Sequence, residues 1–370
     1  MASDPEKPLK IIQWATGAQG TESIRAILDT PDYDLVGCKC FYTQKEGADA
    51  AELAGRQACG VKATTDIQAI LDMDADCVAY MPRNTSLDEV CALLESGKNV
   101  VTTAFLFYPK VMPEADLKRL EAACEKGQTT IHGAGLNPGW ISAVLPLTMS
   151  GLSRSLEHIR LQERADWSFY ESTHITFDNM CFGGPLENVS EEANDFIRFN
   201  SGIFKEMIWL LGDRLNAGLE EVTAEVEVLP APRDAMIFDR ELKAGTAGAQ
   251  RWLWSGKRGG RSLIEIETYW TVGGWYPDHW PTPDMGWTMT LEGDPSQRVH
   301  FLNLASFTRD VPFAEHVTAA SVATAMHAVN AIPAVVAAKP GIATMADLPI
   351  VPSKIGFGNS QQLAKRALDQ

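Results

Sequence analysis

A glycine-rich loop near the N-terminus has the residue types and spacing of a site that binds phosphate groups. Thr16, Gly17, Ala18, Gln19 and Gly20 follow an apolar run and open a helical pattern, in the order G-x-x-G-x-x-S. Glycines let the backbone turn tightly and approach a pyrophosphate, and free N–H groups at a helix start attract its negative charge. A plain tight turn is the alternative, but the place of the loop after a first strand favours dinucleotide binding.

The end of the expected second strand indicates which dinucleotide is bound. Sites for NAD usually have an acidic residue there, which accepts hydrogen bonds from the ribose 2′-hydroxyl. In this chain Thr43 and Lys45 precede the first acidic residue, Glu46. A basic tip suits a 2′-phosphate, so we expect NADP(H), with NAD(H) as the alternative. Taken singly, Lys39 and Lys45 could also be ordinary solvated surface residues.

Three further segments follow expected strands of the same domain, at the edge where parallel sheets bind ligands. Each segment is richer in small and polar residues than strand packing requires. We expect them to contact the cofactor, and ordinary turns are the alternative. The residues are Met81 and Pro82 in the first segment, Thr102, Thr103 and Ala104 in the second, and Asn137 and Pro138 in the third.

A protein that binds NADP(H) for hydride transfer also needs a group that protonates the reduced product. The richest polar segment of the second half of the chain runs from residue 163 to residue 174. Tyr170 is the first candidate for this catalytic proton donor and His174 is the second. No spacing rule fixes either residue, and both could be ordinary pocket or surface side chains. The histidines and cysteines show no metal-ligand spacing, so no metal site is expected.

The elements around these residues alternate regularly between strand and helix from residue 8 to about residue 133. This order predicts an α/β domain with a doubly wound parallel sheet covered on both faces, which is a Rossmann arrangement. Expected strands are 9–15, 33–41, 77–80, 99–103 and 129–132, and expected helices are 21–29, 87–96 and 113–126. Thr65 and Ser86 begin capping boxes, and Gly97 and Gly127 are the stop signals.

The composition changes after residue 139, and nine of the ten tryptophans lie from residue 140 to residue 287. Strand-like stretches at 223–229, 249–255 and 262–272, a hairpin turn at 257–260 and a helix at 194–215 predict a second α+β domain with a mixed sheet. The Ala- and Val-rich helix at 315–338 is expected to be buried on most sides and to return to the first domain. The expected division is therefore 8–140 for dinucleotide binding, 141–314 for substrate and dimerisation, and 315–370 for the returning tail.

Four tryptophans of the second domain stand close together in the sequence. They are Trp270, Trp275, Trp280 and Trp287. We expect them to line a core or a dimer surface, and aromatic walls around a bulky, uncharged substrate are the alternative.

Composition excludes some function classes. With 45% hydrophobic and 22% charged residues the chain is too apolar to be disordered, and a net charge of −16 argues against binding to nucleic acid or to an anionic membrane. The sequence shows neither a signal peptide nor an apolar run of membrane-spanning length, so we expect a soluble cytoplasmic protein. The seven cysteines form no C-x-x-C pair and indicate reduced thiols.

These motifs resemble a known family. The loop Thr16–Gly20, the strand 99–103, the turn 135–139 and the late segment Val329–Pro333 are similar, in order and spacing, to the dihydrodipicolinate-reductase-like family, which includes 2,4-diaminopentanoate dehydrogenase and native amine dehydrogenases. The resemblance covers most of the chain. It implies a Rossmann domain, a substrate domain, NAD(P)H, a homodimer, and reduction of a carbonyl or of the imine formed from it with ammonia. It also implies that Asn330 contacts the nicotinamide side of the cofactor and that Tyr170 faces the substrate.

Two features depart from the family pattern. The His-His-x-x-Lys element of dihydrodipicolinate reductases is absent, which argues against a role in lysine biosynthesis. Family amine dehydrogenases also have a glutamate near the loop after strand 99–103, whereas this chain has no carboxylate from Ala104 to Tyr108. Three functions therefore stay open: reductive amination of a hydrophobic ketone or aldehyde, alcohol-forming reduction of the same substrates, and non-catalytic nucleotide binding in a regulatory protein.

Overall fold

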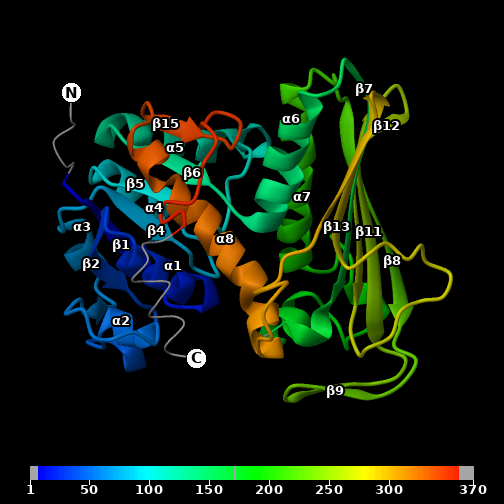
Figure 1. Cartoon of the computed structure of the whole chain (residues 1–370), viewed down its shortest axis with the longest axis horizontal. Helices are drawn as coiled ribbons and strands as arrows, with labels where there is room; N and C mark the ends of the chain where they lie inside the picture. Colours follow the sequence, from blue (N-terminus) through cyan, green and yellow to red (C-terminus); the bar gives the residue numbers. More distant parts are fainter. Residues whose placement is uncertain (1–6, 171, 358–370) are drawn as a thin grey trace. The chain divides into compact units, whose positions relative to one another are not determined.

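The fold is that of a computed structural model, which describes residues 7–170 and 172–357 (Figure 1). The chain divides into two compact units. Of the described residues, unit 1 contains 7–106, 112–135 and 321–357, and unit 2 contains 107–111, 136–170 and 172–320. The division thus falls after residue 135 and within the late helix, and it assigns a short segment after the fifth strand to the second unit.

Unit 1 is built on a seven-stranded sheet in the order β15-β6-β5-β4-β1-β2-β3. The strands are β1 (Leu9–Trp14), β2 (Tyr33–Lys39), β3 (Ala63–Thr64), β4 (Cys77–Tyr80), β5 (Asn99–Thr102), β6 (Thr130–Gly133) and β15 (Gly341–Ala343). All neighbouring strands run parallel. The predicted doubly wound parallel sheet is therefore confirmed, and β15 extends it at the edge beyond β6.

Both faces of this sheet are buried. Ile11 and Ile12 are adjacent in β1 and fully buried, yet they belong to different hydrophobic clusters, because successive side chains of a strand point to opposite faces. The helices of unit 1 are α1 (Ala18–Asp29), α2 (Ala50–Leu53), α3 (Ile67–Leu71), α4 (Leu87–Glu95) and α5 (Glu114–Gly127). A short 3₁₀ turn, η1 (Thr43–Lys45), follows β2.

The helix caps agree with the sequence in one case and differ in another. Ser86 caps α4 by accepting the N–H of Glu89, and Gly97 follows the helix with φ of 85°. The box expected to begin at Thr65 is wrong by one residue, because the side chain of Asp66 accepts the first amides of α3. An aspartate carboxylate competes well with a threonine hydroxyl for this position.

Gly127 is the last residue of α5 and does not stop it, which corrects a second local prediction. The left-handed residue is Gln128, with φ of 55°. Glycine is needed at 127 for another reason: a Cβ atom there would lie 1.8 Å from the carbonyl oxygen of Leu94. The close approach of α5 to α4 therefore sets this residue.

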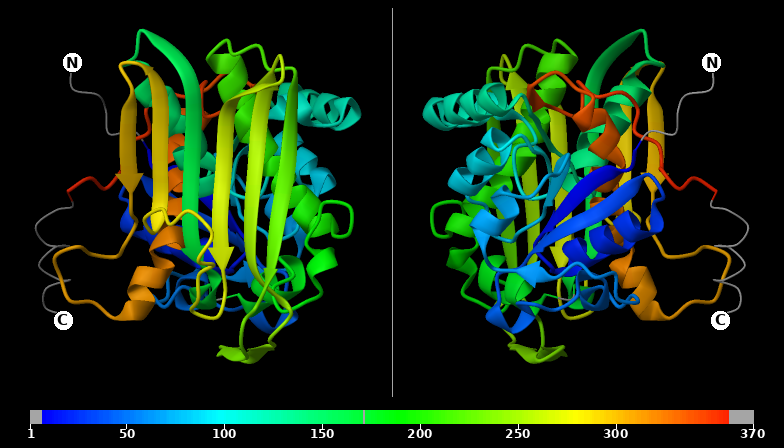
Figure 2. Two further views of the ribbon diagram at one scale, coloured as in Figure 1. Left: turned by 90° about the vertical axis from the view of Figure 1, so that its right-hand side faces the viewer. Right: turned by 90° about the vertical axis from the view of Figure 1, so that its left-hand side faces the viewer.

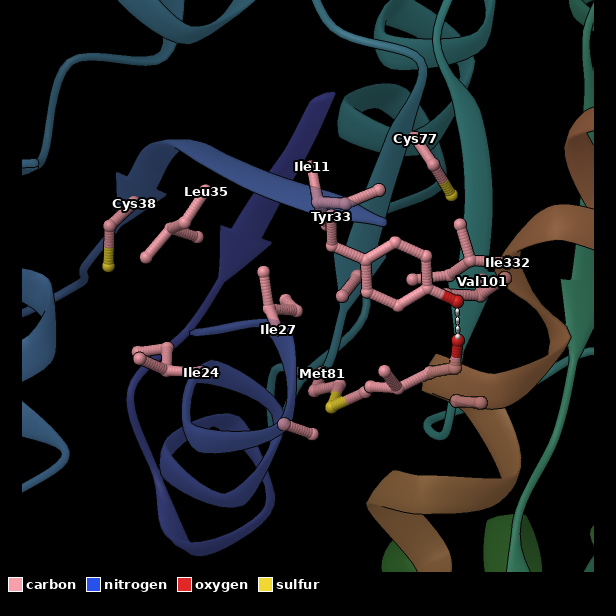
Figure 3. Packing of buried hydrophobic residues seen from close by; sticks show 14 of the residues in the cluster. Ile11, Ile24, Ile27, Tyr33, Leu35, Cys38, Cys77, Met81, Val101 and Ile332 are labelled. Atoms are coloured by element: carbon pink, nitrogen blue, oxygen red, sulfur yellow. Dashed lines mark hydrogen bonds between the residues drawn. The ribbon is translucent and has the colours of Figure 1, made fainter. Parts of the chain in front are cut away.

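The late helix α8 (Phe313–Val336) contains Pro333, which has no N–H to donate to the carbonyl of Val329. The phenol of Tyr33 donates to that carbonyl instead, at 3.0 Å, within the buried cluster shown in Figure 3. Val329, Ile332 and neighbouring alanines belong to this cluster together with residues of β1 and α1. The phenol therefore completes the hydrogen bonding of α8.

The late helix was expected to be buried on most sides. In the structure only one face of the later part of α8 is buried. Ala325, Ala328 and Ala331 are fully buried, but Phe313 at the start is 61% exposed. Among the described helices, α8 alone is long and apolar enough to span a membrane by those two criteria, so the prediction that no run is long enough was wrong. Its packing in the core of unit 1 gives the apolar composition a structural reason.

Unit 2 contains a six-stranded mixed sheet in the order β14-β13-β7-β12-β11-β8. The strands are β7 (Ser155–Asp166), β8 (Glu221–Pro230), β11 (Ala247–Arg258), β12 (Arg261–Thr271), β13 (Gly286–Asp294) and β14 (Gln297–Phe301), with a separate hairpin of β9 (Ala235–Ile237) and β10 (Arg240–Leu242). Only β7 and β12 pair in parallel. Gly259 and Gly260 form the predicted hairpin turn, both with positive φ. The expected mixed sheet is confirmed.

The long helix of unit 2, α7 (Asp195–Arg214), contacts β8, β11 and β12, and no helix of this unit lies over the other face of the sheet in Figure 2. The helix predicted at 194–215 is present, and Asn194 caps it by accepting the N–H of Ile197 at 2.9 Å. The remaining helical segments are α6 (Leu145–Ser150), η2 (Pro109–Val111), η3 (Leu136–Val144), η4 (Trp167–Phe169), η5 (His174–Asn179) and η6 (Leu186–Asn188).

Candidate functional site

The two glycines of the N-terminal loop have different surroundings. A Cβ atom on Gly20 would lie 2.2 Å from the carbonyl oxygen of Ala15, so the fold itself requires glycine there. A Cβ atom on Gly17 would meet nothing within 4 Å. The space beside Gly17 is therefore open for a ligand to approach the backbone.

The start of α1 is suited to a diphosphate. Gly17 is its N-cap and supplies no side chain, and the first turn contains no acidic residue. The first N–H groups of any helix lack intrahelical acceptors, so those of Ala18 and Gln19 are available to an anion. The side chain of Gln19 accepts a hydrogen bond from Thr103 at 2.7 Å, which ties the loop to the end of β5.

The loop after β2 brings two lysines to the same region. Lys45 donates to the backbone oxygen of Thr16 at 2.9 Å and to its hydroxyl at 3.0 Å. Lys39, the last residue of β2, is buried and donates to a backbone carbonyl. Glu46 accepts the amide of Thr65, and hydrogen bonding from Thr65, first from its side chain and then from this amide, lowers the pKa of the Glu46 carboxyl. The first carboxylate after β2 is therefore bound to Thr65 and does not serve as a free acceptor for a ribose hydroxyl.

The remaining unit 1 candidates lie along the carboxyl ends of neighbouring strands. Met81 follows β4 and donates its N–H to Trp14 at 3.0 Å, with Pro82 beside it. Thr102 ends β5, where its hydroxyl accepts the amide of Ala104 at 3.1 Å. Since β1, β4 and β5 are adjacent in the sheet, these segments share one edge with the glycine loop.

Asn330 and His327 occupy α8. The side-chain oxygen of Asn330 accepts the amide of Lys354 at 3.1 Å, so in this structure it contacts the segment after β15. His327 lies 2.8 Å from the carbonyl oxygen of Gly135 through Nδ1, and its burial lowers its pKa. His327 is therefore a largely buried histidine bonded to the backbone of Gly135.

The two predicted proton donors lie on partly exposed parts of unit 2. Tyr170 is 41% exposed and its ring lies against Trp167, with 5.0 Å between centroids. His174 begins η5 and its Nδ1 lies 2.8 Å from a carboxylate oxygen of Asp178. Arg240 also pairs with Asp178 and is the main reason that its pKa falls to about 2. His174 is therefore part of a surface ion-pair group.

A carboxylate that the sequence did not single out lies at the centre of unit 2. Glu163, in β7, accepts the indole N–H of Trp270 at 2.9 Å through one oxygen. Its other oxygen accepts the indole N–H of Trp287 at 2.9 Å and the amide of Asn137 at 2.6 Å. Burial raises the pKa of Glu163, against the opposing effect of these three donors. Pro138 follows Asn137 in the same turn.

A second missed carboxylate is Glu206, on α7. Its side chain accepts the backbone N–H of Tyr108 at 2.7 Å. Burial raises its pKa to about 7, although hydrogen bonds from the amides of Tyr108 and Phe107 oppose the shift. The loop from Ala104 to Tyr108 has no acidic residue of its own, so α7 supplies one to its last two residues.

Both carboxylates leave a faint signal in the sequence. Glu163 stands at the inward position of an alternating strand, two residues after Leu161, where an apolar side chain is usual. Glu206 stands three residues after Ile203, at the border of the apolar stripe of α7. In both cases an acidic residue occupies a place that the periodicity assigns to packing.

The four tryptophans predicted to act together do not form one cluster. Trp270 and Trp287 donate to Glu163, whereas Trp280 donates to Glu227 at 3.0 Å and packs against Tyr269 with 5.8 Å between ring centroids. Glu163 and Glu227 lie on opposite faces of the sheet by strand alternation. Among the described residues, no group of three or more histidines, cysteines or acidic residues could hold a metal ion.

Comparison with known proteins adds the family. The 2,4-diaminopentanoate dehydrogenase C-terminal domain matches residues 143–365. The chain is 28% identical to an amine dehydrogenase of Streptomyces virginiae over 371 residues, which cover 95% of this chain and 99% of the relative. An amine dehydrogenase structure from Mycobacterium smegmatis has a TM-score of 0.74 at 18% identity, over 94% of this chain and 98% of that one. A probable dehydrogenase of Thermotoga maritima has a TM-score of 0.51 at 17% identity, over 92% of each chain.

The two structural matches show a shared fold, and the domain match covers more than half of the chain. The chain therefore belongs to the 2,4-diaminopentanoate dehydrogenase family and is an amine dehydrogenase-like, NAD(P)-dependent oxidoreductase.

Proposed function

We propose that this protein catalyses NADPH-dependent reductive amination of a hydrophobic ketone or aldehyde, with Glu206 as its acid–base residue. The observation that carries the proposal is the position of Glu206, which accepts a hydrogen bond from the loop that lacks a carboxylate of its own. Burial there raises the pKa of Glu206 to about 7. General acid–base groups work best when their pKa lies near the operating pH.

The reaction needs such a group twice. Ammonia adds to the carbonyl carbon, and the departing hydroxyl must receive a proton while the nitrogen loses one, which leaves an imine and water. NADPH, when bound, supplies the hydride that reduces the imine carbon, and the imine nitrogen takes one proton as the amine forms. A carboxyl that is half-protonated near neutral pH can take a proton from nitrogen and return it to oxygen, so the same group serves both transfers.

The position of Glu206 supports this role. Its partners Phe107 and Tyr108 come directly after the segment Ala104–Leu106 that follows β5, and parallel sheets bind their ligands beyond the carboxyl ends of the strands. Backbone amides hold the carboxylate without neutralising it, so it stays able to exchange a proton. Tyr170 is the alternative proton donor, since its phenol belongs to the polar segment 163–174.

The preference for NADPH rests on the loop after β2. Lys45 is held against Thr16 by two hydrogen bonds, and Glu46 is turned to Thr65. A 2′-phosphate gains from the nearby cation, while a ribose 2′-hydroxyl lacks its usual carboxylate acceptor.

The hydrophobic character of the substrate rests on the aromatic side chains of unit 2. Trp167 lies 5.3 Å from Trp270 and 5.9 Å from Phe182, measured between ring centroids. Such groups favour an apolar ligand over a charged one.

Oxidation of NADPH with a panel of ketones and aldehydes, with and without ammonia, tests the proposed reaction. Consumption that requires ammonia is the expected result. Consumption at the same rate without ammonia would instead support alcohol-forming reduction. Replacing NADPH by NADH in the same assay tests the cofactor preference, and a higher kcat/KM with NADH would contradict it.

Variants test the acid–base group. Glu206→Gln removes the ionisable carboxyl but keeps an acceptor for the loop amides, and it should lower turnover by roughly 10²- to 10⁴-fold. Asp213→Asn is the matched control, because Asp213 lies on the same helix and also holds Tyr108, through its phenol. Equal losses of turnover in both variants would show that Glu206 only holds the loop in place and is not the acid–base group. A larger loss in Tyr170→Phe than in Glu206→Gln would assign the proton transfer to Tyr170.

We also propose that the protein is a homodimer, as the family resemblance implies, and that it is cytoplasmic, as expected from the sequence. Light scattering coupled to size-exclusion chromatography should give twice the chain mass. A concentration-independent monomer mass would contradict the proposal.

A further inference from the structure

The carboxylate of Glu163 is held by neutral donors only. Trp270 and Trp287 lie on β12 and β13, the two strands that flank β7, and Trp287 is directly opposite Glu163 in the register. Their indole N–H groups and the amide of Asn137 converge on the two carboxylate oxygens. Among the described residues, no lysine, arginine or histidine is ion-paired with Glu163.

Other buried or half-buried glutamates of the same sheet are treated differently. Glu267 is fully buried, and Arg160 and Arg251 bind its two oxygens at 2.6 and 2.7 Å. Glu227 accepts an indole N–H like Glu163, but it also faces His279 at 3.2 Å and Arg251 at 3.6 Å. Charges withdrawn from water are normally paired, so the missing cation at the half-buried Glu163 calls for an explanation.

Asn137 adds a second acceptor without a partner. Its Nδ2 donates to Glu163, and its Oδ1 is the other polar atom of the same planar amide group. That oxygen is buried and has no hydrogen-bond partner in the structure. A buried acceptor without a donor is costly, and a ligand that donates N–H groups would satisfy it.

We propose that Glu163, Asn137, Trp270 and Trp287 form a binding site for ammonium or for the primary ammonium group of an alkylamine. The site offers one anionic and one neutral acceptor, and the two indoles line it. An N–H-donating monocation matches this set, because it supplies both the missing positive charge and the missing donors. The inference rests on the proposed function, in which ammonia is a substrate and a primary amine is the product.

The test is a titration of the free protein with ammonium chloride, followed by tryptophan fluorescence, without cofactor or ketone. Potassium chloride and tetramethylammonium chloride at equal ionic strength are the comparison salts, since neither cation donates N–H groups. We expect a saturable change with ammonium and methylammonium only. An equal change with potassium, or no saturable change, would overturn the proposal.

Two variants localise the response. Glu163→Gln should weaken ammonium binding by about tenfold or more, the effect of losing one charge-assisted hydrogen bond. Glu227→Gln is the matched control, because Glu227 also accepts an indole N–H on this sheet but has cationic partners. Ammonium affinity unchanged in Glu163→Gln would overturn the site. If that variant fails to fold, Asn137→Ala serves instead, because it removes the unpartnered oxygen from a turn outside the sheet.

Steady-state kinetics separate this inference from the proposed reaction. Glu163→Gln should raise the KM for ammonia while the KM for NADPH stays unchanged. Saturable ammonium binding without turnover would support the ammonium site and contradict the proposed reductive amination. Ammonia-dependent turnover with the same KM for ammonia in wild type and Glu163→Gln would support the proposed reaction and contradict the ammonium site.

Discussion

Replacing Tyr33 by phenylalanine should destabilise the Rossmann unit in a way that depends on Pro333. The phenol of Tyr33 donates to the carbonyl of Val329 at 3.0 Å, and Pro333 is the residue whose N–H would normally occupy that carbonyl. Tyr33 is 7% exposed, so water does not easily replace the lost hydroxyl. The variant leaves a buried carbonyl without a donor.

The expected size of the effect follows from that orphaned carbonyl. Removing one partner and leaving a buried polar group unsatisfied costs about 1–3 kcal/mol. In a Pro333→Ala background, residue 333 regains an N–H that can bond Val329 within the helix. Tyr33→Phe then loses only one of two donors and should cost about 1 kcal/mol or less. The two substitutions should therefore be coupled rather than additive.

Native-state hydrogen exchange of peptides from β2 and α8 is the appropriate assay, because a single unfolding free energy is poorly defined for a chain of two units. We expect faster exchange in Tyr33→Phe and near wild-type exchange in Tyr33→Phe, Pro333→Ala. A cost of Tyr33→Phe that is the same in both backgrounds would show that the phenol does not serve as the missing donor.

Three further predictions concern the cofactor and the proton transfer. Gly17→Asp should fold normally but lose NADPH binding, because its side chain enters open space with a negative charge, whereas Gly20→Ala should disrupt the loop itself; calorimetry and circular dichroism distinguish the two. Lys45→Ala should weaken NADPH about tenfold and leave NADH unchanged, as measured by the KM of each. The pH profile of kcat/KM should bend near pH 7 in wild type, because the pKa of Glu206 is raised to about 7, and Glu206→Gln should lack this limb.

The same raised pKa predicts how stability changes with pH. Between the ordinary pKa of a glutamate, 4.5, and about 7, the folded protein holds a proton on Glu206 that the unfolded chain has lost. Stability should therefore fall as pH rises through this window, and Glu206→Gln should be free of that loss. A steeper fall in the variant would contradict the assigned protonation.

The parallel sheet could be predicted because its signals are local. The run from Leu9 to Trp14, the glycine loop and the capping residue Ser86 each reveal themselves within a few neighbouring residues. The errors were local as well: Asp66 outcompetes Thr65 as a cap, and Gly127 serves a close approach to another helix rather than a stop. Sequence propensity indicates that a polar residue or a glycine is needed near a helix end. Which residue caps the helix, and why the glycine is needed, depends on the groups that each residue contacts in the fold.

The carboxylates of the site could not be predicted because their partners are distant in sequence. Glu206 meets Tyr108 across 98 positions, and Glu163 meets Trp287 across 124. The sequence did indicate a polar segment that begins at Glu163, but it favoured Tyr170 and His174 there. The alternation that places Glu163 on the same face as Leu161 becomes a signal only once Ser155–Asp166 is known to be a strand, and no strand is predicted there from the sequence.

The partners of the buried glutamates separate structural carboxylates from those able to act on a ligand. Burial alone would raise the pKa of Glu267, but bonds from Tyr269 and from the guanidinium of Arg160 lower it overall, so this group stays ionised and holds strands together. Glu163 and Glu206 receive only neutral N–H donors, and burial wins, so both have raised pKa values. A fold that needed them only for stability would gain by pairing them with arginine or by replacing them with apolar residues. Their neutral surroundings therefore support the two roles proposed above, proton exchange at Glu206 and cation binding at Glu163.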